Sequence, residues 1–270
     1  MTGWDDMVRA GKPKGTDPPR LRRTDPSSPG DARTRPAQSV PPSVWVLPDP
    51  SVADPDGVVG VGADLSTSTL VEAYRSGIFP WPHPGVPLPW FCPDPRGILS
   101  PATLRVTRSL RQRLRSCGWT ATVDTAFERV MSACTVDRGD EGTWITPSMI
   151  RAYRRLHDIG WAHSVEIWDG SDLVGGLYGV QVGAVFTGES MFHRATDASK
   201  VALVELLRRF DEAGGRFVDV QVVTPHLASL GAVALPRDRY LEQLADLRDH
   251  DVRMLTSPLP VARLVPIIGP

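Results

Sequence analysis

The amino-acid sequence predicts an α+β protein, with a small N-terminal α/β domain and a larger C-terminal domain built on an antiparallel sheet. The larger domain is indicated by a meander of strands, because apolar runs recur between turn signals at Asp169-Gly170 and at Gly183. The strands of this meander are expected at residues 164–168, 173–182 and 184–191.

An apolar helix and a further strand follow the meander. The helix is predicted at residues 200–210, capped by Asp197 or Ser199, and the strand begins at Phe217. A meander, a helix and one more strand, in that order, are similar to the N-acetyltransferase-like (GNAT-type) fold. We therefore expect the C-terminal domain to be of that type.

Composition divides the chain into regions. Residues 1–40 are dense in proline, arginine, aspartate, serine and glycine, and they cannot bury enough apolar surface to offset the entropy of ordering. Order is expected to begin near Val44. The predicted regions are a disordered Pro/Arg-rich tail at 1–40, the small N-terminal domain at 41–95, the GNAT-like domain at 96–250 and a C-terminal extension at 251–270.

The small domain begins with a short strand, a turn and a helix that Ser66 caps. Its Gly60-Val61-Gly62 run is similar to a dinucleotide-binding loop, but Leu65 stands where the third glycine is needed. From Phe79 to Arg96, prolines predict a rigid, irregular connector, since proline forms no ladder hydrogen bond. The aromatic side chains of this connector either stack on a nucleobase or join two domains.

The larger domain opens with an arginine-rich helix. A solvated helix face usually mixes both signs of charge, so a cluster without acidic residues favours phosphate contacts over a plain solvated surface. The cluster consists of Arg105, Arg108, Arg111, Arg113 and Arg115. Further helices are predicted at 124–135 and from Pro147 to His157, the second capped by Thr146.

Composition and missing motifs exclude several classes of function. The net charge of -1 points to no particular partner, and the 3 cysteines are too widely spaced for a disulfide framework or a metal knuckle. HExxH, GxxxxGK[ST] and GxSxG motifs do not occur, so we expect no metal and no cofactor. Without a signal-peptide core or a bilayer-spanning run, the sequence predicts a cytoplasmic protein.

Polar residues occur on the strand that follows the apolar helix. Valines at every second position from Val218 alternate with Asp219 and Gln221, which therefore share the other face. Polar groups inside a sheet are costly unless they are hydrogen-bonded or serve a site, and the residues alone leave both interpretations open. Glu189, which ends an apolar strand, needs a partner or a cationic ligand for the same reason.

Segments spread in order over about residues 57–235 closely resemble the leucyl/phenylalanyl-tRNA–protein transferase family. They are GIFPW (Gly77 to Trp81), PDPR (Pro93 to Arg96), EGTWIT (Glu141 to Thr146), AYRRLHDIGWAHSVE (Ala152 to Glu166), LVGGLYGV (Leu173 to Val180), GESMF (Gly188 to Phe192), ASK (Ala198 to Lys200) and DVQ with HLASLGA (Asp219 to Ala232). The chain before Val44 and after about Leu247 lies outside the resemblance.

The resemblance implies an enzyme that moves leucine or phenylalanine from aminoacyl-tRNA to the N-terminal arginine or lysine of a protein. That transfer marks the acceptor for degradation in the N-degron pathway. The GNAT-like domain is then catalytic, and the partners are aminoacyl-tRNA and proteins with N-terminal Arg or Lys, with no membrane involved. We expect a monomer.

The resemblance also implies roles for individual residues. Asp219 and Gln221 match the pair at the reacting amine, and Thr224 stands where asparagine is found among relatives. Substrate-binding positions are matched by Tyr74, Trp81, Trp144, Tyr153, Glu189 and Thr224. The aminoacyl pocket is matched by Leu177, Phe186, Met191, Leu203, Leu206, Phe210 and Val218, which could equally be plain core. The cluster residues implied to bind tRNA are Arg105, Arg108, Arg111 and Arg115.

The chemistry of the implied reaction needs few groups. The aminoacyl ester is already activated, and an α-amine with a pKa of about 7.7–8 is partly neutral at pH 7, so positioning dominates. Gln221 is expected to orient the amine, while Asp219 fixes the rotamer of that amide and favours the passing positive charge.

Two other functions compete with this one. An acyl-CoA-dependent N-acyltransferase shares the fold, but residues 193–198 lack the glycine-rich loop that a pyrophosphate needs. A noncatalytic RNA-binding module would use the aromatic residues and arginines, yet it leaves the polar face at Asp219 and Gln221 unexplained.

Overall fold

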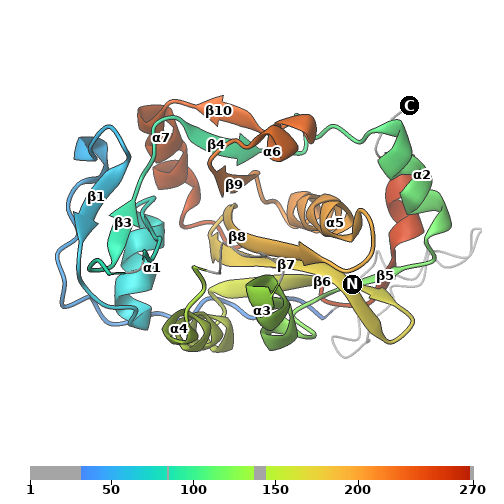
Figure 1. Ribbon diagram of the computed structural model, residues 1–270, viewed down its shortest axis with the longest axis horizontal. Helices are drawn as coiled ribbons and strands as arrows, with labels where there is room; N and C mark the ends of the chain where they lie inside the picture. Colours follow the sequence, from blue (N-terminus) through green and yellow to red (C-terminus); the bar gives the residue numbers. More distant parts are fainter. Residues whose placement is uncertain (1–31, 84, 137–143, 268–270) are drawn as a thin grey trace, which may run out of the picture.

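The computed structural model describes residues 32–83, 85–136 and 144–267, which form two sheets (Figure 1). The small sheet has the order β1-β3-β2, and the large sheet has the order β10-β4-β9-β8-β7-β6-β5-β11. The strands are β1 (Val58–Val61), β2 (Phe79–Pro80), β3 (Pro89–Phe91), β4 (Arg96–Leu99), β5 (Thr120–Val123), β6 (Ala162–Asp169), β7 (Asp172–Val182), β8 (Val185–His193), β9 (Phe217–Gln221), β10 (Val233–Leu235) and β11 (Leu259–Pro260).

Helices cover both faces of the large sheet. The helical elements are η2 (Pro50–Val52), α1 (Thr67–Arg75), α2 (Arg108–Ser116), α3 (Phe127–Val136), α4 (Pro147–Asp158), α5 (Ala198–Glu212), α6 (Pro225–Ser229), α7 (Arg237–Leu247) and η4 (Val261–Ile267). Figure 1 shows α5 on one side of β6, β7 and β8, with α3 and α4 on the other. Two cores result, one holding Leu177, Phe186 and Leu206 and the other holding Tyr153 and Tyr178.

The predicted meander is confirmed. Strands β6, β7 and β8 pair antiparallel, and α5 then returns the chain so that β9 lies parallel to β8. Thr146 and Ser66 also cap their helices as predicted. Asp197 precedes α5 with a φ of 68° and makes no side-chain cap, and its carboxylate pairs with Lys200 Nζ at 2.8 Å.

The connector from Phe79 to Arg96 is more regular than its prolines predicted. It supplies β2 and β3 of the small sheet, with Pro80 ending one strand and Pro89 beginning the other. Proline is tolerated at such strand ends because a ladder N–H is not required there.

Residues 33–40, expected within a disordered tail, lie along the larger domain, while residues 1–31 are outside the described part. The Thr34 N–H donates to the Met254 carbonyl at 2.8 Å, and the Trp161 indole donates to the Gln38 carbonyl at 2.8 Å. A Cβ on Gly160, whose φ is 79°, would lie 2.5 Å from the Pro36 carbonyl oxygen. The backbone carries these contacts, so side-chain composition did not reveal them.

The described part of the C-terminal extension packs against the large sheet and α5. Strand β11 pairs with β5, and Arg263 donates to both oxygens of buried Glu205 on α5 at 2.6 and 2.7 Å. Glu205 also accepts from buried Arg209, which donates further to carbonyl oxygens of Ala121 and Leu255. None of the helices in the described ranges has the length and apolar character that a membrane crossing needs.

Replacing Glu205 with leucine should release residues 255–263 from α5 and lower the free energy of unfolding. Removing one member of a buried charge network leaves the remaining arginines uncompensated, which costs about 3–5 kcal/mol. Urea denaturation should show this loss in Glu205→Leu. The matched control is Glu212→Leu on the same helix, where a partly exposed pair with Arg208 contributes less than about 1 kcal/mol. Equal losses in the two variants would contradict the anchoring role.

Candidate active site

A cavity opens where β8 and β9 part, beside the small sheet. The two strands pair only from Val185 to Thr187 on β8, and beyond that point the space between them is lined by side chains. The cavity has a volume of about 290 Å³. Its lining is Phe79, Pro80, Trp81, Trp144, Leu177, Tyr178, Gly188, Glu189, Ser190, Met191, Leu203, Leu206, Val218, Val220, Gln221, Val222, Thr224 and Leu227.

Glu189 enters this cavity because of a β-bulge. Consecutive residues Tyr178 and Gly179 of β7 pair with Ser190 and Gly188, so Glu189 is the extra residue of β8. A bulge redirects a side chain that would otherwise follow the regular alternation. Glu189 is 7 % exposed, and its carboxyl is the only one among the described residues that line this cavity.

Two buried tyrosines hold Glu189 from behind. The Tyr74 hydroxyl donates to Oε1 at 2.8 Å and the Tyr153 hydroxyl donates to Oε2 at 3.1 Å, while the two hydroxyls also contact each other. The two hydroxyls therefore satisfy the Glu189 carboxyl on its buried side.

Burial raises the pKa of Glu189 to about 7, against the opposing effect of the tyrosine hydrogen bonds, and the charge of Asp219 raises it further. Burial also raises the pKa of Tyr74 and of Tyr153 well above the usual range. Both hydroxyls therefore keep their protons, and Glu189 is the group that changes charge near neutral pH.

Gln221 occupies a strained turn at the end of β9. Its φ is 64°, and the Val222 N–H donates to the Val220 carbonyl at 2.7 Å, the closing bond of a γ-turn. Such a backbone is costly for a residue other than glycine and is found where a site requires it. The sharp turn is accommodated by Gly97, whose added Cβ would lie 3.0 Å from Val220 Cγ2 and from Val223 N.

The turn changes the face on which Gln221 lies. Strict alternation predicted that Gln221 and Asp219 share one face, opposite the valines. In the structure Gln221 lines the cavity together with Val218, Val220 and Val222, and Asp219 does not. The Gln221 amide nitrogen donates to Glu189 Oε1 at 3.2 Å, so the amide oxygen points away from Glu189.

Asp219 is fully buried and accepts hydrogen bonds from five donors. Arg96 donates twice, through Nε to Oδ1 at 2.8 Å and through Nη2 to Oδ2 at 2.7 Å. Tyr240 and Thr187 donate to Oδ2, and the Gln221 backbone N–H donates to Oδ1 at 2.9 Å. We expected Asp219 to fix the Gln221 amide; instead it fixes the Gln221 backbone, and Glu189 holds the amide.

The other expected site residues divide into three groups. Trp81, Trp144 and Thr224 line the cavity, whereas Tyr74 and Tyr153 lie behind Glu189. Of the expected aminoacyl pocket, the lining members are Leu177, Met191, Leu203, Leu206 and Val218. Phe186 and Phe210 are buried in the core, packed edge-to-face with ring centroids 6.1 Å apart, and they do not line the cavity.

Sequence reasoning missed several residues of the site. Arg96 stands in the PDPR segment without an assigned role, and Tyr240 lies beyond the matched segments. Tyr178, Val220 and Leu227 also line the cavity. An arginine in a segment otherwise made of proline and aspartate was the available signal for Arg96, because a buried arginine requires a carboxylate partner.

The arginine cluster lies away from the cavity. Most of it is on α2, which Figure 1 shows at the opposite end of the large sheet from α1 and the small sheet. Arg105, Arg108 and Arg115 are exposed and Arg111 is half-buried, while the Arg113 guanidinium lies over Trp119 at 5.8 Å from the ring centroid.

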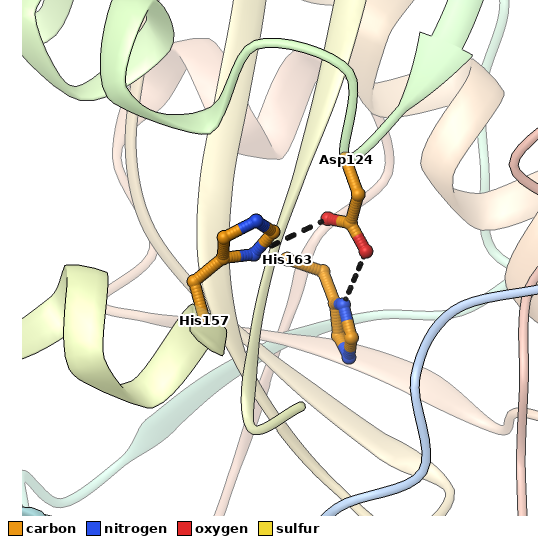
Figure 2. A group of neighbouring side chains, drawn as sticks. All are labelled: Asp124, His157 and His163. Carbon is orange, nitrogen blue, oxygen red and sulfur yellow. Dashed lines mark hydrogen bonds and ion pairs between the residues drawn. The ribbon is translucent and has the colours of Figure 1, made fainter. Parts of the chain in front are cut away.

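A second polar cluster brings Asp124, His157 and His163 together (Figure 2). Their ligand atoms lie within 4.8 Å, which makes them a possible metal-binding group among the described residues. His163 Nδ1 lies 2.8 Å from Asp124 Oδ2, and His157 Nδ1 lies 2.9 Å from the Ala162 carbonyl, which only accepts. These contacts join α4, β6 and the residue that follows β5.

Comparison with known proteins identifies the family. A family model described as leucyl/phenylalanyl-tRNA protein transferase matches residues 98–245, and a model of the N-terminal domain of that protein matches residues 63–94. A leucyl/phenylalanyl-tRNA–protein transferase of Thiobacillus denitrificans is 53% identical over 198 residues, covering 73% of this chain and 87% of that protein. The chain belongs to the leucyl/phenylalanyl-tRNA–protein transferase family.

Further relatives agree with this assignment and with the resemblance seen in the sequence. The family's protein from Chromohalobacter salexigens is 54% identical over 72% of this chain and 76% of its own length. That from Yersinia pestis is 46% identical over 82% of this chain and 92% of its own length. A solved structure of L-PGS from Bacillus licheniformis covers 71% of this chain and 66% of its own, with a TM-score of 0.35 and 11% identity, too weak a likeness to support an argument.

The raised pKa of Glu189 predicts how stability depends on pH. Because the folded pKa of about 7 exceeds the ordinary value of 4.5, the stabilising contribution is complete below pH 4.5 and is lost as the pH rises through 7. The loss amounts to about 3 kcal/mol. Glu189→Gln cannot ionise, so its unfolding free energy relative to the wild type should rise by that amount between pH 4.5 and pH 8.

Urea titrations at several pH values measure this difference. Exposed Glu242, which pairs with Arg239 on the surface, provides the control variant Glu242→Gln with an expected flat difference. Parallel curves for wild type and Glu189→Gln would show that the carboxyl ionises normally in the folded protein.

Proposed function

We propose that this protein transfers leucine or phenylalanine from aminoacyl-tRNA to the N-terminal arginine or lysine of acceptor proteins and so marks them for degradation. The observation that carries the proposal is an apolar cavity whose polar side is formed by Glu189 and Gln221. Family membership agrees with it, since the relatives are named for the two amino acids and for tRNA. We place the reaction in the cytoplasm, carried out by a monomer.

The apolar part of the cavity suits a leucyl or phenylalanyl side chain. Leu177, Leu203, Leu206 and Val218 give a hydrophobic lining, and Met191 supplies a flexible side chain that adapts to either shape. A pocket of this kind discriminates against a missing methylene by only about 1–3 kcal/mol, so some methionine should also be accepted.

The polar part of the cavity suits the attacking amine. Glu189 attracts the amine in its cationic form and, with a pKa of about 7, holds the proton that the amine gives up. Gln221 directs its amide oxygen away from Glu189 and accepts a hydrogen bond from the neutral amine. The amine nitrogen then forms the new bond to the ester carbon and the ester C–O bond breaks. The released ribose oxygen takes the second proton that the nitrogen loses as it becomes the amide.

Asp219 serves this reaction indirectly. Five donors occupy its oxygens, so it neither contacts the amine nor accepts its proton. Its contribution is the fixed turn of Gln221. Positioning of this kind agrees with a reaction whose ester is already activated.

The order of meander, α5 and parallel strand β9 supports a GNAT-type domain within the mixed sheet. An acyl-CoA substrate is disfavoured on the same fold, because the Asp197 carboxylate stands at the start of α5, where the pyrophosphate would need free backbone amides. A module that only binds RNA does not require the strained turn at Gln221.

Incubating the protein with labelled leucyl-tRNA and a peptide that begins with arginine, without ATP or CoA, tests the proposal. Label should appear on the peptide. Gln221→Ala should lower kcat by about 10- to 100-fold, because the amine loses the hydrogen-bond acceptor that orients it. No label with active reagents would refute the activity. Full activity of Gln221→Ala together with an inactive Gln221→Glu would refute the orienting role alone.

The exposed arginine cluster is proposed to contact phosphates of the donor tRNA. Arg108→Ala with Arg111→Ala should weaken leucyl-tRNA binding and reduce the slope of log affinity against log salt by up to about 2. The control removes two arginines elsewhere, Arg239 and Arg253, each partnered with a surface carboxylate. A slope equal to that of the control would remove the cluster from the tRNA interface.

A further inference from the structure

We propose that Arg96 is a positioning residue that holds the two sides of the cavity in register, by fixing Asp219 on one side and the Gly77–Phe79 backbone and ring on the other. The inference rests on the proposed transfer reaction, and it assigns a role to the arginine that ends the PDPR segment. Arg96 does not line the cavity and therefore acts through the residues that it holds.

The contact with Asp219 is a buried, two-point ion pair. Arg96 is 1 % exposed, and its Nε and Nη2 atoms face the two oxygens of Asp219 at 2.8 and 2.7 Å. Paired parallel hydrogen bonds fix direction as well as distance. Arg96, the first residue of β4, therefore sets the plane of the Asp219 carboxylate.

The Asp219 carboxylate passes this orientation to the strained turn. Its Oδ1 atom accepts from Arg96 Nε and also from the backbone N–H of Gln221 at 2.9 Å. Because Gln221 has a φ of 64°, its backbone needs a fixed acceptor to stay in the turn. Rotation of the carboxylate would release the turn and redirect the amide that faces the amine.

The opposite edge of the guanidinium reaches the small domain. Arg96 Nη1 donates to the Gly77 carbonyl at 3.1 Å, directly after the helix that carries Tyr74. The guanidinium carbon lies 4.8 Å from the Phe79 ring centroid, and Phe79 lines the cavity. The Arg96 guanidinium thus contacts both Gly77, which follows the helix that carries Tyr74, and Asp219, which holds the Gln221 backbone.

Tyr240 on α7 completes the arrangement. Its ring centroid lies 4.5 Å from the guanidinium carbon, while its hydroxyl donates to Asp219 Oδ2 at 2.8 Å. A lysine ammonium lacks the planar fork needed to contact Asp219 twice and Gly77 at the same time. Arg96→Lys therefore keeps the positive charge but cannot hold Asp219 and Gly77 in a fixed position relative to each other.

The role predicts a specific kinetic signature. The apolar lining from Leu177, Met191 and Leu203 lies on β7, β8 and α5, whereas the hydrogen bonds and ring contacts of Arg96 described above go to other residues. Arg96→Lys should lower kcat about 10- to 100-fold, while KM for leucyl-tRNA stays within about 3-fold. The reaction is measured with leucyl-tRNA and the arginine peptide at several concentrations.

Arg237→Lys is the matched control. Arg237 also links the two parts of the chain, through carbonyl oxygens of Cys92 at 3.0 Å and Ser51 at 3.3 Å, but it does not contact Asp219. If Arg96 only joined the domains, both variants would lose activity alike. We expect Arg237→Lys to keep kcat within about 2-fold of the wild type.

A double variant separates folding from positioning. Arg96→Met with Asp219→Leu replaces the buried pair by apolar side chains, a change that often leaves stability intact. The melting temperature should recover relative to Arg96→Met, whereas kcat should stay low, because the Gln221 N–H has lost its acceptor. Recovery of both, or an Arg96→Lys variant as active as Arg237→Lys, would overturn the inference. An inactive wild type overturns the proposed function, and this inference with it.

Discussion

The cost of burying two carboxylates beside each other is the constraint on which the rest of the structure depends. Asp219 and Glu189 lie on neighbouring strands in the centre of the large sheet, and the charge of one raises the pKa of the other. The fold stabilises them in different ways. Asp219 receives an arginine and three further partners, whereas Glu189 receives neutral donors and keeps a proton until about neutral pH.

The two solutions suit two different tasks. A carboxylate saturated with donors is a fixed point, and the structure uses Asp219 to hold a turn that its backbone alone would not adopt. A carboxyl that changes charge near pH 7 can exchange a proton with an amine, and in the proposed reaction the bulge places Glu189 for that exchange. Anchoring and the proposed proton transfer are therefore divided between Asp219 and Glu189, whereas the family resemblance implied a place at the reacting amine for Asp219 and a substrate-binding position for Glu189.

Local sequence patterns predicted much of the fold. Most of the features that they did not predict depend on the conformation of the backbone. Alternation and turn glycines located β6 to β8, and the hydroxyl caps at Ser66 and Thr146 located two helices. The face of Gln221 could not be predicted, because a positive φ at a residue other than glycine leaves no mark in the pattern. Phe186 and Phe210 were indistinguishable from lining residues, since apolar character does not say which side of a core a ring faces.

The Arg96–Asp219 pair joins positions 123 residues apart, and this separation has a consequence for how the protein is made. Strand β4 leaves the ribosome long before β9 and β10, the strands between which it lies in the sheet. Until then the arginine has no carboxylate, and the small domain has no α7 against which to pack. Because such distant pairing is entropically slow, the cavity beside this pair should be among the last parts of the newly made chain to form.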